Sequence, residues 1–440
     1  SMIEPTQSEE VRADGVELAI ALTSRSGGHD AAEEALEKAV DDASTEIAEK
    51  AARHLVEQGD KSAADTLAER LANLEEDDDK RDLARFLVEH GATVSKSTAE
   101  SLKESEDDEL TQLGWQLHAI IDGDAIFDEL EKKFGSTNYD DRLIAVKALG
   151  HIDRPGAYKM LEKGLFEGRA EFRKESIEGL KRLAHPRTIP ALKKALNDEQ
   201  DKEVLLKVID AISRIDDDQS LNLLRFKTTT NDREVKMAII KAIRRLGDPD
   251  GVRPLRVMSQ DRNLDIRWEA FLTTLELDRE RGLSQLDSQL RNPPEGFMSD
   301  IEELDAPVRD EVIAHVLENG DSDARGAALA TARTVVESQF DTYRKLAEDS
   351  QAPENVRREA LLALIERNDK EDLSTFEEVA GDSRAKKIAR LAAWTLAARG
   401  GEDQEDAFEE LSESDDEALK AILAWGVANV HAGKTRQAQQ

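Results

Sequence analysis

The sequence predicts an all-α protein, a right-handed α-solenoid of about 11–13 helical pairs stacked in one array. Two observations lead to this prediction. An amphipathic pattern returns along much of the 440-residue chain with a period of 31 or 32. Between its occurrences, Gly, Pro and Asp turn signals precede a second apolar segment, so each period holds two helices joined by turns.

The pattern is clearest in the middle of the chain. Its small residue occupies positions 148, 179, 211, 242 and 273, with successive spacings of 31, 32, 31 and 31. The first of these occurrences runs from Asp141 to Gly150, and Ile189 to Leu196 exemplifies the second helix of a pair. A spacing this regular predicts structurally equivalent positions in stacked repeats.

Both ends of the chain follow the same period with weaker patterns. Toward the N-terminus, Gly59, Gly91 and Gly123 each close an apolar segment and recur at a spacing of 32. Toward the C-terminus, Arg325 and Arg357 belong to the pattern and have the same spacing. We therefore predict four segments: N-terminal acidic helical repeats over 1–136, regular repeats with a basic rim over 137–280, an irregular connection over 281–304, and C-terminal repeats over 305–440.

The predicted connection interrupts the period. The spacing between the pattern arginines Arg267 and Arg309 is 42. The stretch between Asn292 and Met298 contains two consecutive prolines and cannot be helical throughout, because proline lacks a backbone N–H group. The connection is either a simple joint between two halves of the array, which we favour, or a binding loop.

The repeat unit resembles the HEAT repeat, in particular the short variety first associated with phycobilin lyases. The resemblance rests on an acidic residue, a Val-Arg pair, small residues and a Leu-Gly or Ile-Gly end, as in Asp141 to Gly150 or Asp232 to Gly247. It is most complete over Asn138 to Asp278. It implies the solenoid fold and, as typical roles, adaptors in signalling or motility and factors in complex assembly. It does not name a partner, because fold and function separate freely in such arrays.

Charge and cysteine content restrict the class of protein. The chain has 95 Asp and Glu against 61 Lys and Arg, a formal net charge of -34, and it has no Cys. Such charge destabilises a compact state unless salt screens it. The composition therefore favours a halophilic archaeon as the source, with an acidic protein of an ordinary cell as the alternative. No apolar run approaches the roughly 18 residues that cross a bilayer, so we expect a cytoplasmic protein without a membrane partner.

The sequence contains no motif that predicts catalytic residues, a metal site or a cofactor. None of the eight His is followed by Glu, so the paired ligands of di-iron enzymes with this type of repeat are missing. The run Asp216 to Asp218 lacks the alternating carboxylates of a calcium loop and is interpreted as a solvated turn. Trp268, with Asp265 and Arg267, is the nearest match to the aromatic pocket of helical-repeat DNA glycosylases, although core packing is the simpler explanation. Lyase or glycosylase activity is therefore only the alternative to a non-catalytic protein.

Basic residues are concentrated in the regular repeats. From Asp140 to Arg256 there are 25 Lys and Arg against 20 Asp and Glu, so this block carries +5 and the rest of the chain -39. Aligning the repeats puts basic side chains in columns near the C-terminal end of the first helix of each pair, along a predicted rim of the concave surface. The predicted binding residues are these columns and one aromatic residue: His151, Lys181, Arg182, Arg214, Lys241, Arg244, Arg245 and Trp268.

Two interpretations of the columns remain open. Arg182, Arg214 and Arg245 occupy equivalent positions, so they could form one edge that binds an anionic partner. Alternatively, they cap free carbonyls and complement the dipole at ordinary helix C-termini. The arginines of the repeat pattern are instead expected to connect neighbouring repeats: Arg142, Arg173, Arg267, Arg309, Arg325 and Arg357.

These observations favour a non-catalytic protein-binding scaffold or adaptor whose concave face meets an acidic surface of another protein. The alternative is a nucleic-acid-binding repeat protein that uses the same basic rim. Phosphate contacts weaken steeply as salt rises, so nucleic acid is the less favoured partner in a salt-adapted cytoplasm. The sequence does not fix the oligomeric state.

Overall fold

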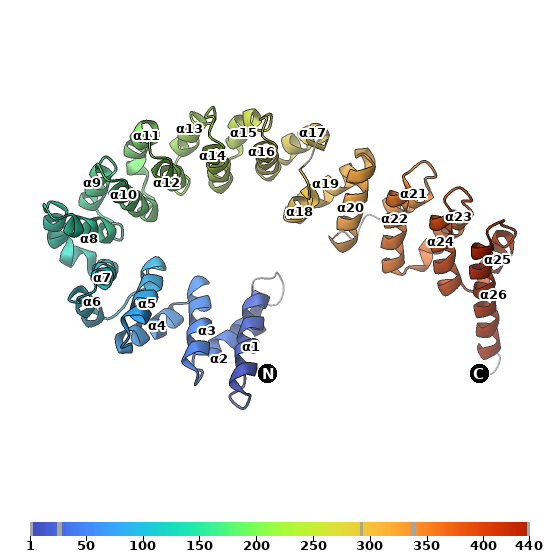
Figure 1. Ribbon diagram of the computed structural model, residues 1–440, viewed down its shortest axis with the longest axis horizontal. Helices are drawn as coiled ribbons and strands as arrows, with labels where there is room; N and C mark the ends of the chain where they lie inside the picture. The colour runs from blue at the N-terminus through green and yellow to red at the C-terminus, as the bar shows by residue number, and fades with distance from the viewer. Residues whose placement is uncertain (1–2, 24–28, 291–293, 336–339, 438–440) are drawn as a thin grey trace. The chain divides into compact units, whose positions relative to one another are not determined.

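The computed structural model describes residues 3–23, 29–290, 294–335 and 340–437. Within these ranges the chain forms 26 α-helices, a few short 3-10 turns and no strand. It divides into two compact units, Ser1–Leu246 and Gly247–Gln440, and Figure 1 shows that each unit is a succession of helical pairs. The predicted all-α solenoid of helical pairs is confirmed. None of the described helices is long and apolar enough to cross a membrane.

In the first unit, most helices pack against the helix that follows them along the chain. Figure 1 shows α8, α10, α12 and α14 in one row on the inside of the curve of this unit, with α9, α11 and α13 in a second row outside it. We call the first row the inner helices. The bounds are α1 Glu9–Thr23, α2 His29–Ala39, α3 Thr45–Glu57, α4 Lys61–Asn73, α5 Asp77–Glu89, α6 Lys96–Lys103, α7 Asp108–Phe134, α8 Tyr139–Leu149, α9 Pro155–Gly164, α10 Ala170–Leu183, α11 Ile189–Asp198, α12 Lys202–Ile212, α13 Asp218–Arg225 and α14 Arg233–Leu246.

In the second unit, α20, α22, α24 and α26 pack successively, and α21, α23 and α25 each pack on the helix that follows them. The bounds are α15 Val252–Met258, α16 Leu264–Leu277, α17 Arg279–Leu290, α18 Phe297–Glu302, α19 Ala306–Asn319, α20 Ser322–Val335, α21 Phe340–Glu348, α22 Glu354–Arg367, α23 Leu373–Ala380, α24 Lys386–Arg399, α25 Glu405–Leu411 and α26 Glu417–Gln437.

The predicted register agrees with these bounds. The repeat pattern that begins at Asp141 is α8, and the predicted second helix that begins at Ile189 is α11. In the weaker N-terminal repeats, Gly59 and Gly91 follow the ends of α3 and α5 with positive φ angles of 93° and 63°. Glycine tolerates this backbone conformation best. Asp122, beside Gly123, breaks α7 with φ -152° and ψ 70°, so two helices of a pair meet there.

The core explains why the pattern repeats. In α12, Val204, Val208, Ile209 and Ile212 are all buried, because apolar residues at helical spacing form one face. Each such side chain stabilises the fold by about 1.5–3 kcal/mol when it is fully buried. A continuous core of this kind follows the first unit from α1 to α7, and another follows the second unit from α16 to α26.

Small residues of the pattern allow neighbouring inner helices to approach closely. A Cβ atom added to Gly150, just after α8, would lie 2.6 Å from the Cα atom of Gly179 in α10. Contacts this short between carbon atoms are not tolerated, and a backbone atom cannot rotate away. The close approach of α8 and α10 therefore requires that residues 150 and 179 be small.

The substitution Gly150→Ala is expected to lower the free energy of unfolding of the first unit by about 2–3 kcal/mol, because overpacking must push α8 and α10 apart. Urea unfolding followed by circular dichroism measures this change. The matched control is Gly168→Ala, since a Cβ atom at Gly168 would meet no atom within 4 Å. Equal unfolding midpoints for the two variants would show that the close approach is not a constraint.

Three of the six arginines of the repeat pattern connect neighbouring repeats, as expected. Arg173 of α10 donates two hydrogen bonds to Glu199, which precedes α12, at 2.8 and 3.0 Å. Arg142 of α8 forms an ion pair with Glu167 before α10, at 2.6 Å. The same connection recurs in the second unit, where the buried Arg357 of α22 forms an ion pair with Asp382 before α24. Of the other pattern arginines, Arg325 donates to the backbone of Glu318 at 2.7 Å and Arg309 to its neighbour Asp310 at 3.0 Å.

The segment predicted as an irregular connection, 281–304, is largely helical where it is described. It contains most of α17 and all of α18, and only three residues of the Asn292–Met298 stretch, Pro294 to Gly296, are described as non-helical. Asn292 and Pro293 lie outside the described residues. Phe297, Met298 and Ile301 of α18 are buried, and α18 packs on α19 and α20. Helix α18 is therefore part of the packed array of the second unit, and the joint and the binding loop both stay predictions.

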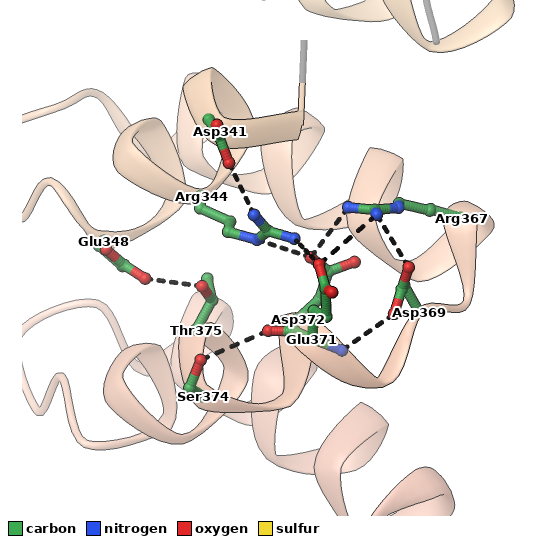
Figure 2. A network of polar contacts seen from close by, with 9 residues as sticks. All are labelled: Asp341, Arg344, Glu348, Arg367, Asp369, Glu371, Asp372, Ser374 and Thr375. Atoms are coloured by element: carbon green, nitrogen blue, oxygen red, sulfur yellow. Dashed lines mark hydrogen bonds and ion pairs between the residues drawn. The ribbon is translucent and has the colours of Figure 1, made fainter. Parts of the chain in front are cut away.

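A buried carboxylate joins α21, α22 and α23 in the second unit (Figure 2). Asp372 ends the 3-10 turn Lys370–Asp372 and has no exposed surface. Its Oδ1 atom accepts a hydrogen bond from Nε of Arg344 at 2.8 Å and lies 3.6 Å from Nη1 of Arg367. Each arginine has a further carboxylate partner, Asp341 for Arg344 and Asp369 for Arg367. The Oδ2 atom of Asp372 has no hydrogen-bond partner among the described residues.

Candidate binding surface

Charged side chains of the inner helices α10, α12 and α14 form ion pairs from one repeat to the next. Lys181 of α10 lies 2.9 Å from Glu178 on its own helix and 3.0 Å from Asp210 on α12. Lys207 of α12 donates back to Glu178, and Arg245 of α14 donates back to Asp210. Two predicted binding residues, Lys181 and Arg245, are therefore engaged by carboxylates of the same surface.

This network shifts the pKa values of its members. Burial alone would raise the pKa of Glu178 and Asp210, but hydrogen bonds from the neighbouring lysines and arginine outweigh burial and lower both pKa values. Burial would lower the pKa of Lys181, but the hydrogen bonds it donates to the same two carboxylates raise it. All three groups therefore stay charged near neutral pH.

Three other predicted cations are exposed: Arg182 in the last turn of α10, Arg214 just beyond α12, and Lys241 in α14. Their side chains make no hydrogen bond or ion pair with any residue that the structure describes. They lie on, or directly after, three successive inner helices that pack side by side. We call Arg182, Arg214 and Lys241 the inner-face cations.

Repeat equivalence explains why Arg182 and Arg214 lack the partner that Arg245 has. The position of Asp210 corresponds to Glu178 one repeat earlier and to Lys147 one repeat before that, at spacings of 32 and 31. The residue that corresponds for Arg214 is Glu178, which two lysines already engage, and the residue that corresponds for Arg182 has a like charge.

Arg182 also lies against the C-terminal end of α8. A Cβ atom added to Gly150 would come 2.9 Å from its Nη1 atom. Burial lowers the pKa of Arg182, while Glu178, Glu175 and Glu89 act in the opposite direction. This position agrees with the helix-end interpretation of the column, although Arg182 as a whole residue is exposed.

His151 follows Gly150 and lies beside Arg182. Burial, and then the charge of Arg182, lowers the pKa of His151 to about 3. Its Nε2 atom is buried without a hydrogen-bond partner in the described structure. The folded protein therefore holds a neutral imidazole here at any pH above about 3.

Lowering the pH is expected to destabilise the first unit through His151, at pH values still above those at which the carboxylates of the unit take up protons. In the unfolded chain this imidazole takes up a proton below about pH 6.5, while the folded state resists protonation. The stability contribution is therefore complete above pH 6.5 and is lost as the pH falls toward 3. Between pH 7 and pH 5, the unfolding free energy of the natural protein should fall by about 1–2 kcal/mol relative to that of His151→Gln. Urea titrations at both pH values measure this difference, and parallel pH dependences would contradict it.

The remaining predicted residues do not line an open surface together with the inner-face cations. Arg244 is partly buried in α14. Trp268 belongs to the second unit, is only 4% exposed, and donates a hydrogen bond from Nε1 to Asp300 at 2.8 Å. Its ring packs edge-on against Phe297 at 5.7 Å between centroids. Trp268 is therefore a core residue, which corrects its placement among binding residues and removes the aromatic pocket of the glycosylase alternative.

The carboxylates of the inner face were missed as site residues. Glu175 is partly buried, and burial raises its pKa against the influence of Lys147. Glu178 and Asp210 are separated by the repeat spacing of 32, which already indicated that they share a column. Together these carboxylates make the surface a mosaic of both charges. Among the described residues, no three or more His, Asp or Glu are arranged to hold a metal ion.

The regular repeats agree with a known family. Residues 124–213 and 167–230 match the family model of HEAT repeats. These matches contain α8 to α13, and with them Arg182 and Arg214. The matched family comprises HEAT repeats in general, so the likeness to the phycobilin-lyase variety rests on the sequence pattern alone.

No curated protein matches the chain. Among solved structures, Kap121p is 12% identical with a TM-score of 0.36, over 95% of this chain and 57% of Kap121p. A structure of Kap121p bound to Pho4p is also 12% identical, with a TM-score of 0.38, over 98% of this chain and 63% of the other. An engineered protein is 18% identical with a TM-score of 0.26, over 91% and 98% of the two chains. The chain spans about three fifths of the length of the Kap121p chains that it matches.

Proposed function

We propose that the protein is a non-catalytic scaffold or adaptor whose inner-face cations bind an acidic surface of another protein. The observation that supports this proposal is that Arg182, Arg214 and Lys241 are exposed on three successive inner helices without an ion pair among the described residues. They belong to a block of net charge +5 in a chain of net charge -34. Signalling, motility or complex assembly in a salt-adapted cytoplasm is the setting that we propose for this role.

An acidic protein fits this surface because charge complementarity accelerates association and disfavours wrong partners. In a halophilic cytoplasm most protein surfaces are acidic, so a cationic patch provides contrast. The Glu178 and Asp210 network fixes Lys181 and Arg245 between repeats, so the inner-face cations are surrounded by side chains that are held in place. Rigid presentation reduces the entropy that is lost on binding.

Nucleic acid is the second candidate, because the same cations could contact phosphates. The structure disfavours it on one specific ground, since Glu175, Glu178 and Asp210 lie among the cations on the same helices. A phosphate backbone carries only negative charge and would meet these carboxylates. A gel-shift assay at low and at molar salt separates the candidates, because phosphate contacts release counterions and weaken as salt rises.

Affinity capture with the full chain at native salt, followed by mass spectrometry and reconstitution with purified partner, tests the proposal. The expected result is one or a few protein partners, with an acidic face, that rebind as purified proteins. Failure of every captured protein to rebind directly, or a gel shift with nucleic acid at molar salt, would overturn it.

A further inference from the structure

Two exposed tryptophans occupy equivalent positions in the second unit. Trp394 of α24 is 54% exposed and Trp425 of α26 is 47% exposed, and their spacing is 31, one repeat period. Helices α24 and α26 pack against each other, and Figure 1 shows them side by side. The other two tryptophans, Trp115 and Trp268, are 7% and 4% exposed. Large exposed aromatic side chains that repeat at one position indicate a contact surface, because Trp contributes strongly where proteins bind.

Further apolar side chains extend this surface. Leu391 precedes Trp394 by three positions, and Ile422 precedes Trp425 by three, so each pair lies on one helix face. Both aliphatic side chains are partly buried against the core. Leu362 of α22, partly exposed, precedes Trp394 at a spacing of 32 and so occupies the equivalent position one repeat earlier. We call Leu362, Leu391, Trp394, Ile422 and Trp425 the tryptophan stripe.

Positive charge borders the stripe toward the N-terminal ends of α22 and α24. Lys387 shares a face of α24 with Leu391 and Trp394, is exposed, and forms no ion pair with any described residue. Arg358 of α22, one turn before Leu362, is exposed and forms an ion pair with its neighbour Glu359. A cation in the first turn of a helix opposes the helix dipole, so Lys387 does not serve the stability of α24. Its position is suited to an acidic group of a partner.

The spacing of the stripe determines which backbone can follow it. Packed helices lie roughly 8–10 Å apart, so Trp394 and Trp425 are separated by about that distance across α24 and α26. Residues seven apart in an α-helix lie on nearly the same face and about 10.5 Å apart along its axis. In an extended strand, residues on one face recur at about 6.8 Å intervals, which does not match.

We propose that the tryptophan stripe docks an amphipathic α-helix of a partner protein, with large apolar residues seven positions apart and acidic residues on the flank that meets Lys387 and Arg358. The helix crosses α24 and α26 with its apolar face on the two indole rings. This site is separate from the inner-face cations and does not depend on the function proposed for them.

A synthetic fluorescein-labelled helical peptide, about five helical turns long, tests the proposal. It is Ala-based, with Leu at positions 4, 8, 11 and 15 and Glu along one flank. Fluorescence anisotropy with the full chain should show saturable binding, and tryptophan emission should shift to shorter wavelength as the indoles leave water. A peptide with the leucines replaced by Ala should bind at least ten-fold more weakly, and one with Lys in place of Glu at least three-fold more weakly. Both comparisons use the natural protein and need no variant.

The protein-side test is the double substitution Trp394→Ala and Trp425→Ala, with Phe226→Ala as the matched control. Phe226 is 75% exposed in the first unit, so its removal deletes an exposed aromatic ring elsewhere. The double variant should lose at least ten-fold in peptide affinity and all of the emission shift, whereas the control should bind normally. Equal binding by the double variant, or tighter binding of the Lys peptide, would overturn the proposal. A concentration-dependent dimer that the double variant abolishes would also overturn it by assigning the stripe to a second copy.

Discussion

Replacing Arg344 with Met is expected to lower the free energy of unfolding of the second unit by about 3–5 kcal/mol. The reason is the carboxylate of Asp372, which is fully buried and takes its hydrogen bond from Arg344. Without that guanidinium, the nearest cation is Arg367 at 3.6 Å. A buried charge left without close compensation is among the most destabilising changes in a protein interior.

A second variant separates the buried charge from the loss of packing. The double substitution Arg344→Met and Asp372→Leu removes both members of the pair, and it should recover much of the lost stability because no uncompensated charge remains. Arg358→Met is the control, since that side chain is exposed and its ion pair should contribute less than about 1 kcal/mol. Circular dichroism during urea unfolding measures all three variants. A loss below about 1 kcal/mol for Arg344→Met would mean that water or Arg367 compensates Asp372.

The fold could be predicted because the repeat makes the same physical demand in every period. Gly179 is small because α8 approaches α10 at Gly150, and equivalent positions must meet the same packing requirement. Three of the six pattern arginines were predicted correctly for the same reason, since Arg142, Arg173 and Arg357 each reach the loop before the next repeat. The connection after α17 was harder to predict, because α18 is a short helix of six residues with no counterpart in the period.

The candidate surface could be predicted only in part. The period places Arg182, Arg214 and Arg245 at one position, but whether each is free depends on the side chain one repeat earlier. Arg245 meets Asp210, whereas the corresponding residue for Arg182 is Lys147. An ion pair between repeats depends on the residues of two columns, so aligning one column does not predict which arginines form ion pairs.

Whether a tryptophan is buried or exposed could not be predicted from the repeat pattern either. Trp268 directly follows a pattern arginine and is buried against α18, which the repeat pattern does not contain. Trp394 and Trp425 carried a signal in their spacing of one repeat period, but they were not singled out because apolar residues in a helix are usually core. They are exposed because no helix covers them in the described structure. Local sequence does not predict whether another helix covers a side chain.

Reversing the inner-face cations is expected to weaken binding to the acidic partner by about 100-fold. The triple variant is Arg182→Glu, Arg214→Glu and Lys241→Glu. These side chains are exposed and form no ion pair among the described residues, so the fold should be retained. Arg245, which the sequence placed in the same row, is left unchanged because it engages Asp210, and its reversal would disturb the surface itself.

The control variant reverses Lys61, Lys96 and Lys345, which are exposed on other helices and likewise form no ion pair with described residues. It changes the net charge by the same amount, so it isolates the position of the charges from their number. Surface plasmon resonance at native salt, with the captured partner immobilised, compares both variants with the natural protein. A selective loss of affinity and a slower association rate for the inner-face variant are the predicted result. Equal affinities for the two variants would contradict the role of Arg182, Arg214 and Lys241 as a binding surface.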